Sequence, residues 1–300
     1  MDKSRFRCGY AAIVGRTNVG KSTLLNRLLR QKISVTSRKP QTTRQRLLGI
    51  KTTSSYQVIY VDTPGLHQHD NRALNRYMNR VASNALLGVD VVIWLVEAMR
   101  WTDMDAQILE RLSVRPTTVL VGVNKIDRVI PRKKLLPFLD VISKYSIARE
   151  IIPLAARRGE NAQRLEEVVV RYLPEQDAIF PEDQITDRSD QFLAAEFIRE
   201  KLIRRLGQEL PYRLNVQIEQ SIEQGQLLHV DAIVWVEKTS QKAIVIGERG
   251  QVLKDAGSAA RKDLERLFDR QVFLRLWVKV KEDWSDDEQA LPRMGYGETW

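Results

Sequence analysis

The chain has 300 residues, which predicts two domains and leaves one or three as alternatives. Its 43% hydrophobic content allows sizeable cores, and its single cysteine, Cys8, excludes an intramolecular disulfide and is typical of a reducing cytosol. The excess of positive charge lies in residues 1–180, which contain 30 Lys and Arg against 16 Asp and Glu and give the chain its net charge of +10. Residues 181–300 contain 18 Lys and Arg against 22 Asp and Glu. Charge alone therefore does not predict that the second half binds a polyanion.

No long apolar segment opens the sequence, so a signal peptide is not expected. The longest apolar stretch, 89–96, is far shorter than the roughly 20 residues of a membrane span and contains Asp90. We therefore interpret it as a buried strand.

The first predicted elements are a buried strand over 10–14 and a helix that begins at Lys21. The loop between them fits G-x-x-x-x-G-K-[ST], in which backbone N–H groups surround phosphates; a plain strand-to-helix turn is the alternative. Lys21 is expected to reach the β- and γ-phosphate oxygens and Ser22 to bind Mg²⁺. The predicted nucleotide contacts in this loop are Gly15, Arg16, Thr17, Asn18, Val19, Gly20, Lys21, Ser22 and Thr23.

A second phosphate-side motif follows a compact apolar strand over 57–61. An Asp at the end of such a strand can hold Mg²⁺ through water, and a Gly three residues later can offer its N–H to the γ-phosphate. Downstream of a phosphate loop, this D-x-x-G pattern indicates a nucleotide site. The residues predicted to take part are Asp62, Thr63, Pro64, Gly65 and Leu66.

The strand over 118–123 ends in Asn124, Lys125 and Asp127, an N-K-x-D motif that predicts which base is bound. The Asp127 carboxylate can accept hydrogen bonds from the N1–H and the exocyclic amine of guanine, and adenine lacks both donors in that arrangement. Asn124 is expected to brace the loop, and the stem of Lys125 to cover the base. A charged surface turn is the alternative interpretation.

These motifs, in this order, resemble the translation-factor-like branch of the small GTPases over roughly residues 8–172. The resemblance implies an α/β P-loop GTPase domain, with a mostly parallel six-stranded sheet, helices on both faces and an antiparallel edge strand around 47–51. It also implies that Ala155, Ala156 and Arg157 form the loop whose backbone contacts guanine O6. Because Ala155 replaces the usual serine, the N–H of Ala156 is the expected donor.

The segment 41–44, Gln-Thr-Thr-Arg, is the predicted first switch. A threonine hydroxyl there would complete the Mg²⁺ shell only when a γ-phosphate is present, and its release would let the loop disorder. Thr43 is the preferred residue and Thr42 the alternative. The predicted metal ligands are Ser22, Thr43 and Asp62.

The catalytic residues that we predict are Lys21, Thr43 and Gly65. Leu66 stands where the signalling GTPases that the chain resembles carry a water-orienting glutamine. Either intrinsic hydrolysis is slow, which we expect, or another group supplies the positioning and the charge. Asn18 has two interpretations. Either it binds K⁺ beside the β- and γ-phosphates, as in the relatives it resembles, or it only holds the loop by local hydrogen bonds.

The second half is predicted to be a separate domain. Its expected boundaries are 1–173 for the GTPase domain, 174–190 for a linker and 191–300 for the second domain with its tail. Periodicity predicts a helix, a hairpin turning at Gly225, a long helix and a final strand, over 191–206, 214–236, 252–268 and 272–280. By propensity, residues 243–246 are a strand.

Between these elements lies a second glycine motif, Gly247-Glu248-Arg249-Gly250. It resembles the G-x-x-G loop of KH domains, which clamps about four nucleotides of a single strand; a plain tight turn is the alternative. The element order resembles the type II KH topology, an α+β fold, which implies a short helix over 243–246. The predicted RNA contacts are Val245, Ile246, Gly247, Glu248, Arg249, Gly250 and Lys254, and the acidic run over 282–288 is expected to repel RNA.

A GTPase domain followed by a type II KH domain resembles a family of bacterial ribosome-assembly GTPases, and the segments 181–188 and 284–288 agree with it. The resemblance implies GTP hydrolysis, binding of the 3′ end of small-subunit ribosomal RNA and assistance with 30S maturation. It also implies a cytoplasmic protein, loosely associated with the inner membrane face, that we expect to be monomeric. The preferred function is a nucleotide-driven switch. The alternatives are a constitutive RNA-binding module and a membrane-recruited regulatory GTPase whose G-x-x-G loop is structural.

Overall fold

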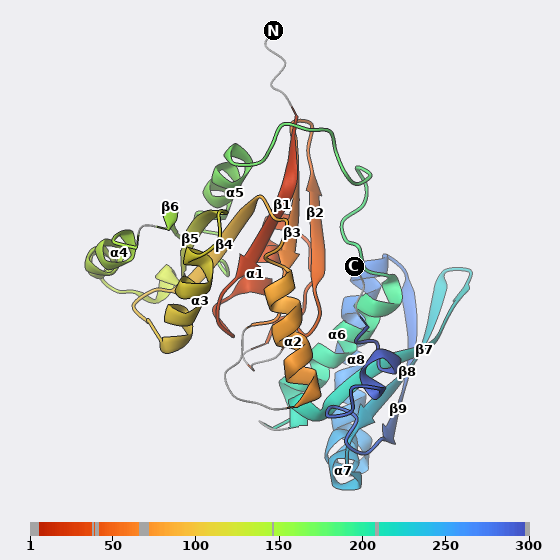
Figure 1. Cartoon of the computed structure of the whole chain (residues 1–300). Helices are drawn as coiled ribbons and strands as arrows, with labels where there is room; N and C mark the ends of the chain where they lie inside the picture. The colour runs from red at the N-terminus through yellow and green to blue at the C-terminus, as the bar shows by residue number, and fades with distance from the viewer. Residues whose placement is uncertain are drawn as a thin grey trace. The chain divides into compact units, whose positions relative to one another are not determined.

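The computed structural model describes most of the chain (Figure 1), namely residues 6–37, 39, 42–65, 72–145, 147–207 and 210–297. The predicted contributions of Gln41 and Leu66 lie outside these residues. The chain divides into two compact units. Unit 1 comprises Met1–Ser34, Thr43–His69 and Met78–Asp187, and unit 2 comprises Val35–Thr42, Asp70–Tyr77 and Arg188–Trp300.

Unit 1 is built on a six-stranded sheet in the order β2-β3-β1-β4-β5-β6. All neighbouring strands run parallel except β2, which is antiparallel to β3, as the sequence predicts. Strands covered on both faces need apolar side chains on both, which explains the near-continuous apolar runs. The strands are β1 (Arg7–Val14), β2 (Leu47–Thr52), β3 (Tyr56–Asp62), β4 (Val91–Glu97), β5 (Thr118–Asn124) and β6 (Ala148–Pro153).

Helices cover both faces of this sheet, and their apolar side chains pack against those of the strands. Ile108, Leu112, Leu135 and Ile142 pack with the buried Trp94 in one core cluster. Leu24, Leu25 and Leu28 are buried on the first helix, which contacts the last helix of the unit. The helices are α1 (Lys21–Leu29), α2 (Ala73–Asn84, shared by the two units), α3 (Asp103–Ser113), η1 (Ile126–Arg128), η2 (Arg132–Lys134), α4 (Leu135–Ser143) and α5 (Ala162–Arg171).

The first part of the segment expected to be a linker, residues 174–187, belongs to unit 1 and packs along the edge of its sheet. The N–H of Ile50 donates to the carbonyl of Ile185 (2.9 Å), and the N–H of Leu48 donates to Asp187 Oδ1 (2.9 Å). Since an edge strand leaves backbone groups unpaired, the segment covers the exposed edge of β2. The boundaries 1–173, 174–190 and 191–300 stay a prediction.

Unit 2 has the order helix–strand–strand–helix–helix–strand that the KH resemblance implies. Its three-stranded sheet has the order β7-β8-β9, with β7 antiparallel and β9 parallel to β8. Gly225, at φ +58°, turns the hairpin between the first two strands. The elements are α6 (Asp190–Arg205), η3 (Leu210–Arg213), β7 (Leu214–Gln224), β8 (Leu227–Val236), α7 (Thr239–Ile246), η4 (Glu248–Gly250), α8 (Gln251–Phe268), β9 (Gln271–Val280) and α9 (Ala290–Arg293).

The strand expected from propensity over 243–246 is wrong, and the helix implied by the resemblance is confirmed. These β-prone residues form the last turn of α7. The helix begins at Thr239, before the apolar run over 243–246. The side chain of Gln241 accepts hydrogen bonds from the N–H groups of Glu237 and Lys238 at the beginning of α7. Burial of Val245 and these capping bonds outweigh the local preference of the apolar run.

The acidic run over 282–288 is partly buried instead of forming a solvated tail. Trp284 and Ser285 are buried, and Ser285 Oγ donates to Glu237. Asp286 Oδ1 accepts from the N–H of Ala73, the first residue of α2 (3.0 Å). The expectation that this run repels RNA stays a prediction. Among the described residues, we find no helix long and apolar enough to cross a membrane.

Candidate nucleotide and RNA sites

The phosphate loop joins β1 to α1, and its two glycines have positive φ angles. Gly15 and Gly20 have φ of +149° and +115°, and a Cβ at Gly20 would lie 2.3 Å from Asn124 Nδ2. The ammonium of Lys21 donates to the carbonyls of Gly15 (2.9 Å) and Arg16 (3.1 Å), across the loop in which a phosphate would sit. Burial lowers the pKa of Lys21 to about 8, against the opposing effect of Asp62. An anionic ligand would restore the full charge of this ammonium.

The three predicted metal ligands lie together. Ser22 Oγ is 2.9 Å from Thr43 Oγ1 and donates to Asp62 Oδ2, also at 2.9 Å. Ser34 Oγ donates to the same carboxylate oxygen at 2.8 Å, a contact that the sequence did not reveal. Asp62 Oδ1 is buried and accepts no hydrogen bond from the described residues. Hydroxyl and carboxylate oxygens are the donors that Mg²⁺ prefers, so these residues fit that ion.

The alternative switch residue, Thr42, makes different contacts. Its hydroxyl lies 2.7 Å from Ser37 Oγ and donates to the carbonyl of Lys39 at 2.7 Å. Because Thr43, and not Thr42, reaches Ser22, the geometry favours Thr43 as the residue of the metal site.

The D-x-x-G motif lies against the phosphate loop. A Cβ at Gly65 would be 2.6 Å from Thr17 Cγ2 and 3.0 Å from Thr17 N, so a side chain at this position would displace the loop. Thr63 is buried, and its hydroxyl donates to the carbonyl of Ile13 (3.2 Å). The motif is thereby anchored to β1, and Gly65 lies directly against the phosphate loop.

Asn124 braces the base-recognition loop, as expected. Its Nδ2 donates to the carbonyl of Val19 (2.8 Å), and its Oδ1 accepts from the N–H of Ala156 (3.0 Å). One side chain thus ties the phosphate loop to the Ala155–Arg157 loop. The N–H of Ala156, which is expected to contact guanine O6, donates to Asn124 in this structure.

Asp127 follows Lys125, which has a left-handed backbone conformation (φ +67°). The carboxylate of Asp127 is 15% exposed, and its nearest cation is Arg158, with Nε 3.6 Å from Oδ2. This long contact to an exposed guanidinium costs little to break, so the carboxylate is available for a base.

Glu97, which no sequence motif indicated, lies between the phosphate loop and the base-recognition loop. Its carboxylate pairs with Arg16 of the phosphate loop and with Lys125 Nζ (3.0 Å). Burial alone would raise the pKa of Glu97, but the hydrogen bonds from Lys125 and Arg16 hold it below its usual value. The register gave a signal, because Glu97 ends β4 directly beside Asn124 at the end of β5.

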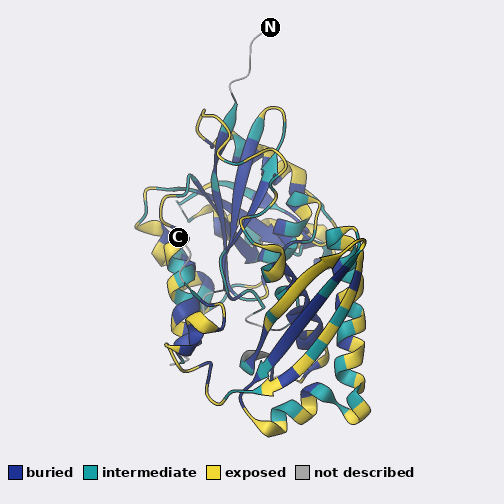
Figure 2. Ribbon diagram, turned by 90° about the vertical axis from the view of Figure 1, so that its right-hand side faces the viewer, coloured by how far each residue is buried: buried dark blue, intermediate teal, exposed yellow. Residues whose placement is uncertain are grey.

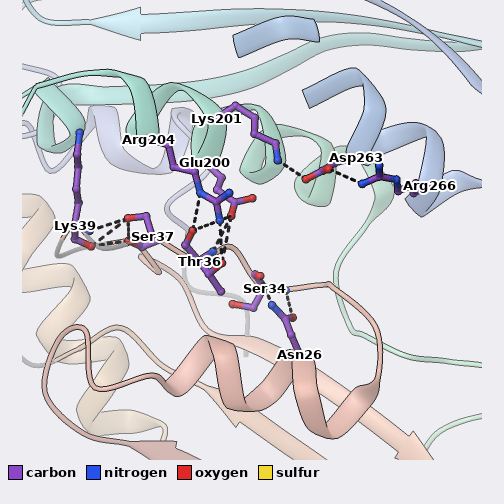
Figure 3. A network of polar contacts seen from close by, with 11 residues as sticks. Asn26, Ser34, Thr36, Ser37, Lys39, Glu200, Lys201, Arg204, Asp263 and Arg266 are labelled. Atoms are coloured by element: carbon purple, nitrogen blue, oxygen red, sulfur yellow. Dashed lines mark hydrogen bonds and ion pairs between the residues drawn. The ribbon is translucent and has the colours of Figure 1, made fainter. Parts of the chain in front are cut away.

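Thr36 and Lys39, which precede the predicted first switch over 41–44, are bonded within unit 2 to α6 and to the residues that follow it (Figure 3). The N–H and the hydroxyl of Thr36 donate to the buried Glu200 Oε1 (3.2 and 3.4 Å). Arg204 donates to the carbonyl of Thr36 (2.7 Å) and pairs with Glu200. The ammonium of Lys39 donates to the carbonyls of Leu206 and Gly207 beyond the end of this helix. Two side chains of α6 and two carbonyls beyond its end therefore hold the residues that precede the switch.

The glycine motif between α7 and α8 has the sharp backbone that an RNA loop requires. Gly247 and Gly250 have φ of +74° and +78°, and Arg249 has φ +49°. A Cβ at Gly247 would lie 2.4 Å from Val252 Cγ2, whereas nothing lies within 4 Å of one at Gly250. Glu248, Arg249 and Lys254 are exposed. Val245 is fully buried, so its side chain belongs to the core, and its contact with RNA stays a prediction.

Comparisons with known proteins agree with this geometry. The family model described as a 50S ribosome-binding GTPase matches residues 10–125, and a KH domain model matches residues 209–285. The GTPase Era of Pseudomonas putida (strain W619) is 54% identical over 292 residues, which cover 97% of each chain. This chain belongs to the Era family of GTPases. The GTPase Era of Pseudomonas aeruginosa (strain LESB58) is also 54% identical, over 97% of this chain and 96% of its own.

Two solved Era structures share the whole fold. The first, Era in complex with MgGDPNP and nucleotides 1506–1542 of 16S ribosomal RNA, is 38% identical and covers 98% of this chain and 100% of its own, with a TM-score of 0.94. The second, an Aquifex aeolicus Era variant bound to GDP·AlF₄⁻, is 37% identical with the same coverage and TM-score. The predicted fold, a P-loop GTPase domain followed by a KH domain, is thereby confirmed.

Proposed function

We propose that this chain is a GTP-hydrolysing switch that binds the 3′ end of small-subunit ribosomal RNA and assists 30S maturation. The observation that carries the proposal is the meeting of Ser22, Thr43 and Asp62 beside a phosphate loop, in a chain that also contains a G-x-x-G loop. The Era relative bound to MgGDPNP and 16S ribosomal RNA supports it.

The reaction is GTP plus water to GDP plus phosphate. Ser22 and Thr43 would hold Mg²⁺ directly and Asp62 through water; the ion, when bound, neutralises charge on the β- and γ-phosphates. The ammonium of Lys21 moves from the loop carbonyls to the phosphate oxygens, and the N–H of Gly65 donates to the γ-phosphate. Asp127 selects guanine, while Asn124 holds the base loop and the phosphate loop in register.

The first switch gives nucleotide a route to unit 2 along the chain. Thr43 contacts Ser22 in unit 1, and the carbonyl of its neighbour Thr42 accepts from Arg199 of α6 in unit 2. Arg199 is fully buried and is held by Glu196 Oε1 at 2.7 Å. A ligand that orders Thr43 therefore acts on a segment whose preceding residue, Thr42, is bonded to α6. The ligand can shift the equilibrium between two arrangements of this segment only by binding one of them more tightly than the other.

Affinity for an oligonucleotide of the 16S 3′ end is expected to differ about tenfold between the GDP complex and the complex with a non-hydrolysable GTP analogue, within the usual range of coupling energies. Glu200→Gln removes the carboxylate charge that holds Thr36, so the difference should shrink to about twofold. Fluorescence anisotropy measures both. Glu223→Gln, on the exposed hairpin, is the control. Equal affinities in the parent protein would eliminate the switch and favour a constitutive RNA-binding module.

We also propose that K⁺ binds beside the phosphates at Asn18, which has a left-handed backbone (φ +60°) in the phosphate loop. Hydrolysis should be at least about tenfold faster in KCl than in NaCl of equal ionic strength, since a cation there would act as an arginine finger does. Asn18→Gly tolerates the backbone conformation and should abolish the difference. Identical rates in the two salts would leave Asn18 a purely local hydrogen-bonding role.

From the family resemblance, we also propose that the protein is a cytoplasmic monomer, loosely associated with the inner face of the inner membrane. Light scattering and cell fractionation test it, and recovery in the membrane fraction without ribosomal subunits would favour the membrane-recruited alternative.

A further inference from the structure

Arg27 of α1 is an exposed arginine whose hydrogen bonds go to the backbone of a distant loop. The strands of unit 1 are mostly buried, and most of its exposed residues lie on the helices and loops around the sheet (Figure 2). Exposed arginines there pair with carboxylates, as Arg132 does with Glu160 and Arg171 with Glu150. Such surface pairs contribute little. The bonds of Arg27 are different, because their acceptors belong to the loop expected to contact guanine.

The acceptors of Arg27 are two successive carbonyls of that loop. Its Nε donates to the carbonyl of Ala156 (3.4 Å), and its Nη2 donates to the carbonyl of Arg157 (2.8 Å). A Cβ at Gly159 would lie 3.2 Å from Arg27 Cδ, so the stem of the arginine lies directly against the backbone that follows. The side chain thus holds the loop through both its guanidinium and its stem.

These carbonyls belong to a tight turn over residues 155–158. The N–H groups of Arg158 and Gly159 both donate to the carbonyl of Ala155, at 3.0 and 2.8 Å. Ala155 is fully buried and has no polar side chain, so it cannot hold the turn through a side-chain hydrogen bond. The orientation of the turn therefore depends on groups from other elements.

The turn presents carbonyls to Arg27 and N–H groups to the opposite side, because the C=O and the N–H of a planar trans peptide point in opposite directions. On the N–H side, Asn124 Oδ1 accepts from Ala156 (3.0 Å). The N–H of Arg157 meets no protein acceptor within the described part of the chain. A ligand base beside Asn124 would therefore find an open donor on this side of the turn.

Both groups that hold the turn are fixed to the phosphate loop. Arg27 lies on α1, a helix of nine residues that begins at Lys21 of that loop. Asn124 donates to the carbonyl of Val19 in the same loop (2.8 Å). A nucleotide bound by its phosphates thus meets a turn whose orientation is already set, and a preorganised donor makes a stronger contact than one that must first be ordered.

We propose that Arg27 is a positioning residue for recognition of the guanine 6-oxo group. It holds the carbonyl side of the 155–158 turn so that the N–H side faces O6. Asp127 recognises the donors of the base, and the turn recognises its acceptor. Loss of the guanidinium would loosen the turn and weaken only the contact to O6. This proposal rests on the proposed function, because it takes guanine as the bound base.

The test compares three nucleotides, GDP, 6-thio-GDP and IDP. Sulfur is a poorer acceptor than O6, whereas IDP keeps O6 and lacks the 2-amine. The parent should prefer GDP over 6-thio-GDP about tenfold, as expected for one hydrogen bond. Arg27→Met keeps an apolar stem and removes the guanidinium. It should weaken binding of GDP and of IDP equally, about fivefold, and that of 6-thio-GDP by less than about twofold, since coupled groups lose their interaction only once. Isothermal titration calorimetry with nucleotide-free protein measures all three.

Arg30→Met, at an exposed arginine that follows the last residue of α1, is the matched control and should bind as the parent does. Arg27→Lys keeps one charged donor and should restore part of the preference for oxygen over sulfur. Equal losses for GDP and 6-thio-GDP in Arg27→Met would show that Arg27 does not act through O6, and unchanged affinity for GDP would show that the turn needs no such support; either result overturns the proposal. If the parent binds none of the three nucleotides, the proposed function itself fails, which is a distinguishable result.

Discussion

Asp127→Asn is expected to reduce affinity for GTP by a factor of about 10² to 10⁴ and to raise affinity for XTP. The carboxylate accepts two hydrogen bonds from guanine, and each bond to a charged group contributes about 1.5–3 kcal/mol. The asparagine would place an NH₂ group against the 2-amine of guanine, donor against donor. Xanthine has a carbonyl at this position, which accepts from that NH₂ group.

Isothermal titration calorimetry with GTP, XTP and ATP measures the exchange. Asp140→Asn, which changes an exposed carboxylate on α4 that pairs with Lys144, is the control and should bind as the parent does. If Asp127→Asn kept its affinity for GTP, or if the parent hydrolysed ATP as well as GTP, the assignment of base recognition to Asp127 would be wrong.

Gly250→Asp is expected to weaken binding of single-stranded RNA about 30-fold or more while GTP hydrolysis continues. A carboxylate would stand where the phosphate backbone approaches, and like charges brought together cost several kcal/mol. Nothing lies within 4 Å of a Cβ at this position, so the added side chain projects into open space. Gly247→Asp is less informative alone, because its Cβ would collide with Val252.

Gly225→Asp is the matched control. Gly225 also has a left-handed backbone (φ +58°) with nothing within 4 Å of its Cβ, and it lies at the tip of the hairpin. The two variants therefore add the same charge and similar backbone strain. Binding by anisotropy and phosphate release should separate them. RNA affinity that survives in Gly250→Asp, or in the double variant with Gly247→Asp, contradicts the KH-loop assignment.

The parts of this protein that could be predicted from the sequence are those that depend on residues close together in the chain. The phosphate loop depends on glycines and a lysine within eight residues, and the strands on apolar runs that need no distant partner to be recognised. Propensity failed at residues 243–246, where capping by Gln241 and burial of Val245 select a helix. The same burial places the side chain of Val245 in the core.

Contacts between distant residues could not be predicted in this way. Ser34 reaches Asp62 across 28 residues, and Glu97 reaches Arg16 across 81. Thr36 and Glu200 are separated by 164 residues, so no local pattern links the segment before the switch to a helix of the second half. The register of strands and the path of the chain bring such groups together, and neither has a signature at the residues themselves.

The amino-acid sequence by itself determined the nucleotide chemistry, the order of the elements and the presence of a G-x-x-G loop, because each depends on residue types at short spacing. Tertiary structure alone brought Thr43 and not Thr42 to Ser22, bonded Thr36 to α6, and determined which face of the second sheet is left open. Alternation along β9 shows that the strand has two different faces, but only the packing of α7 and α8 determines which of them remains exposed.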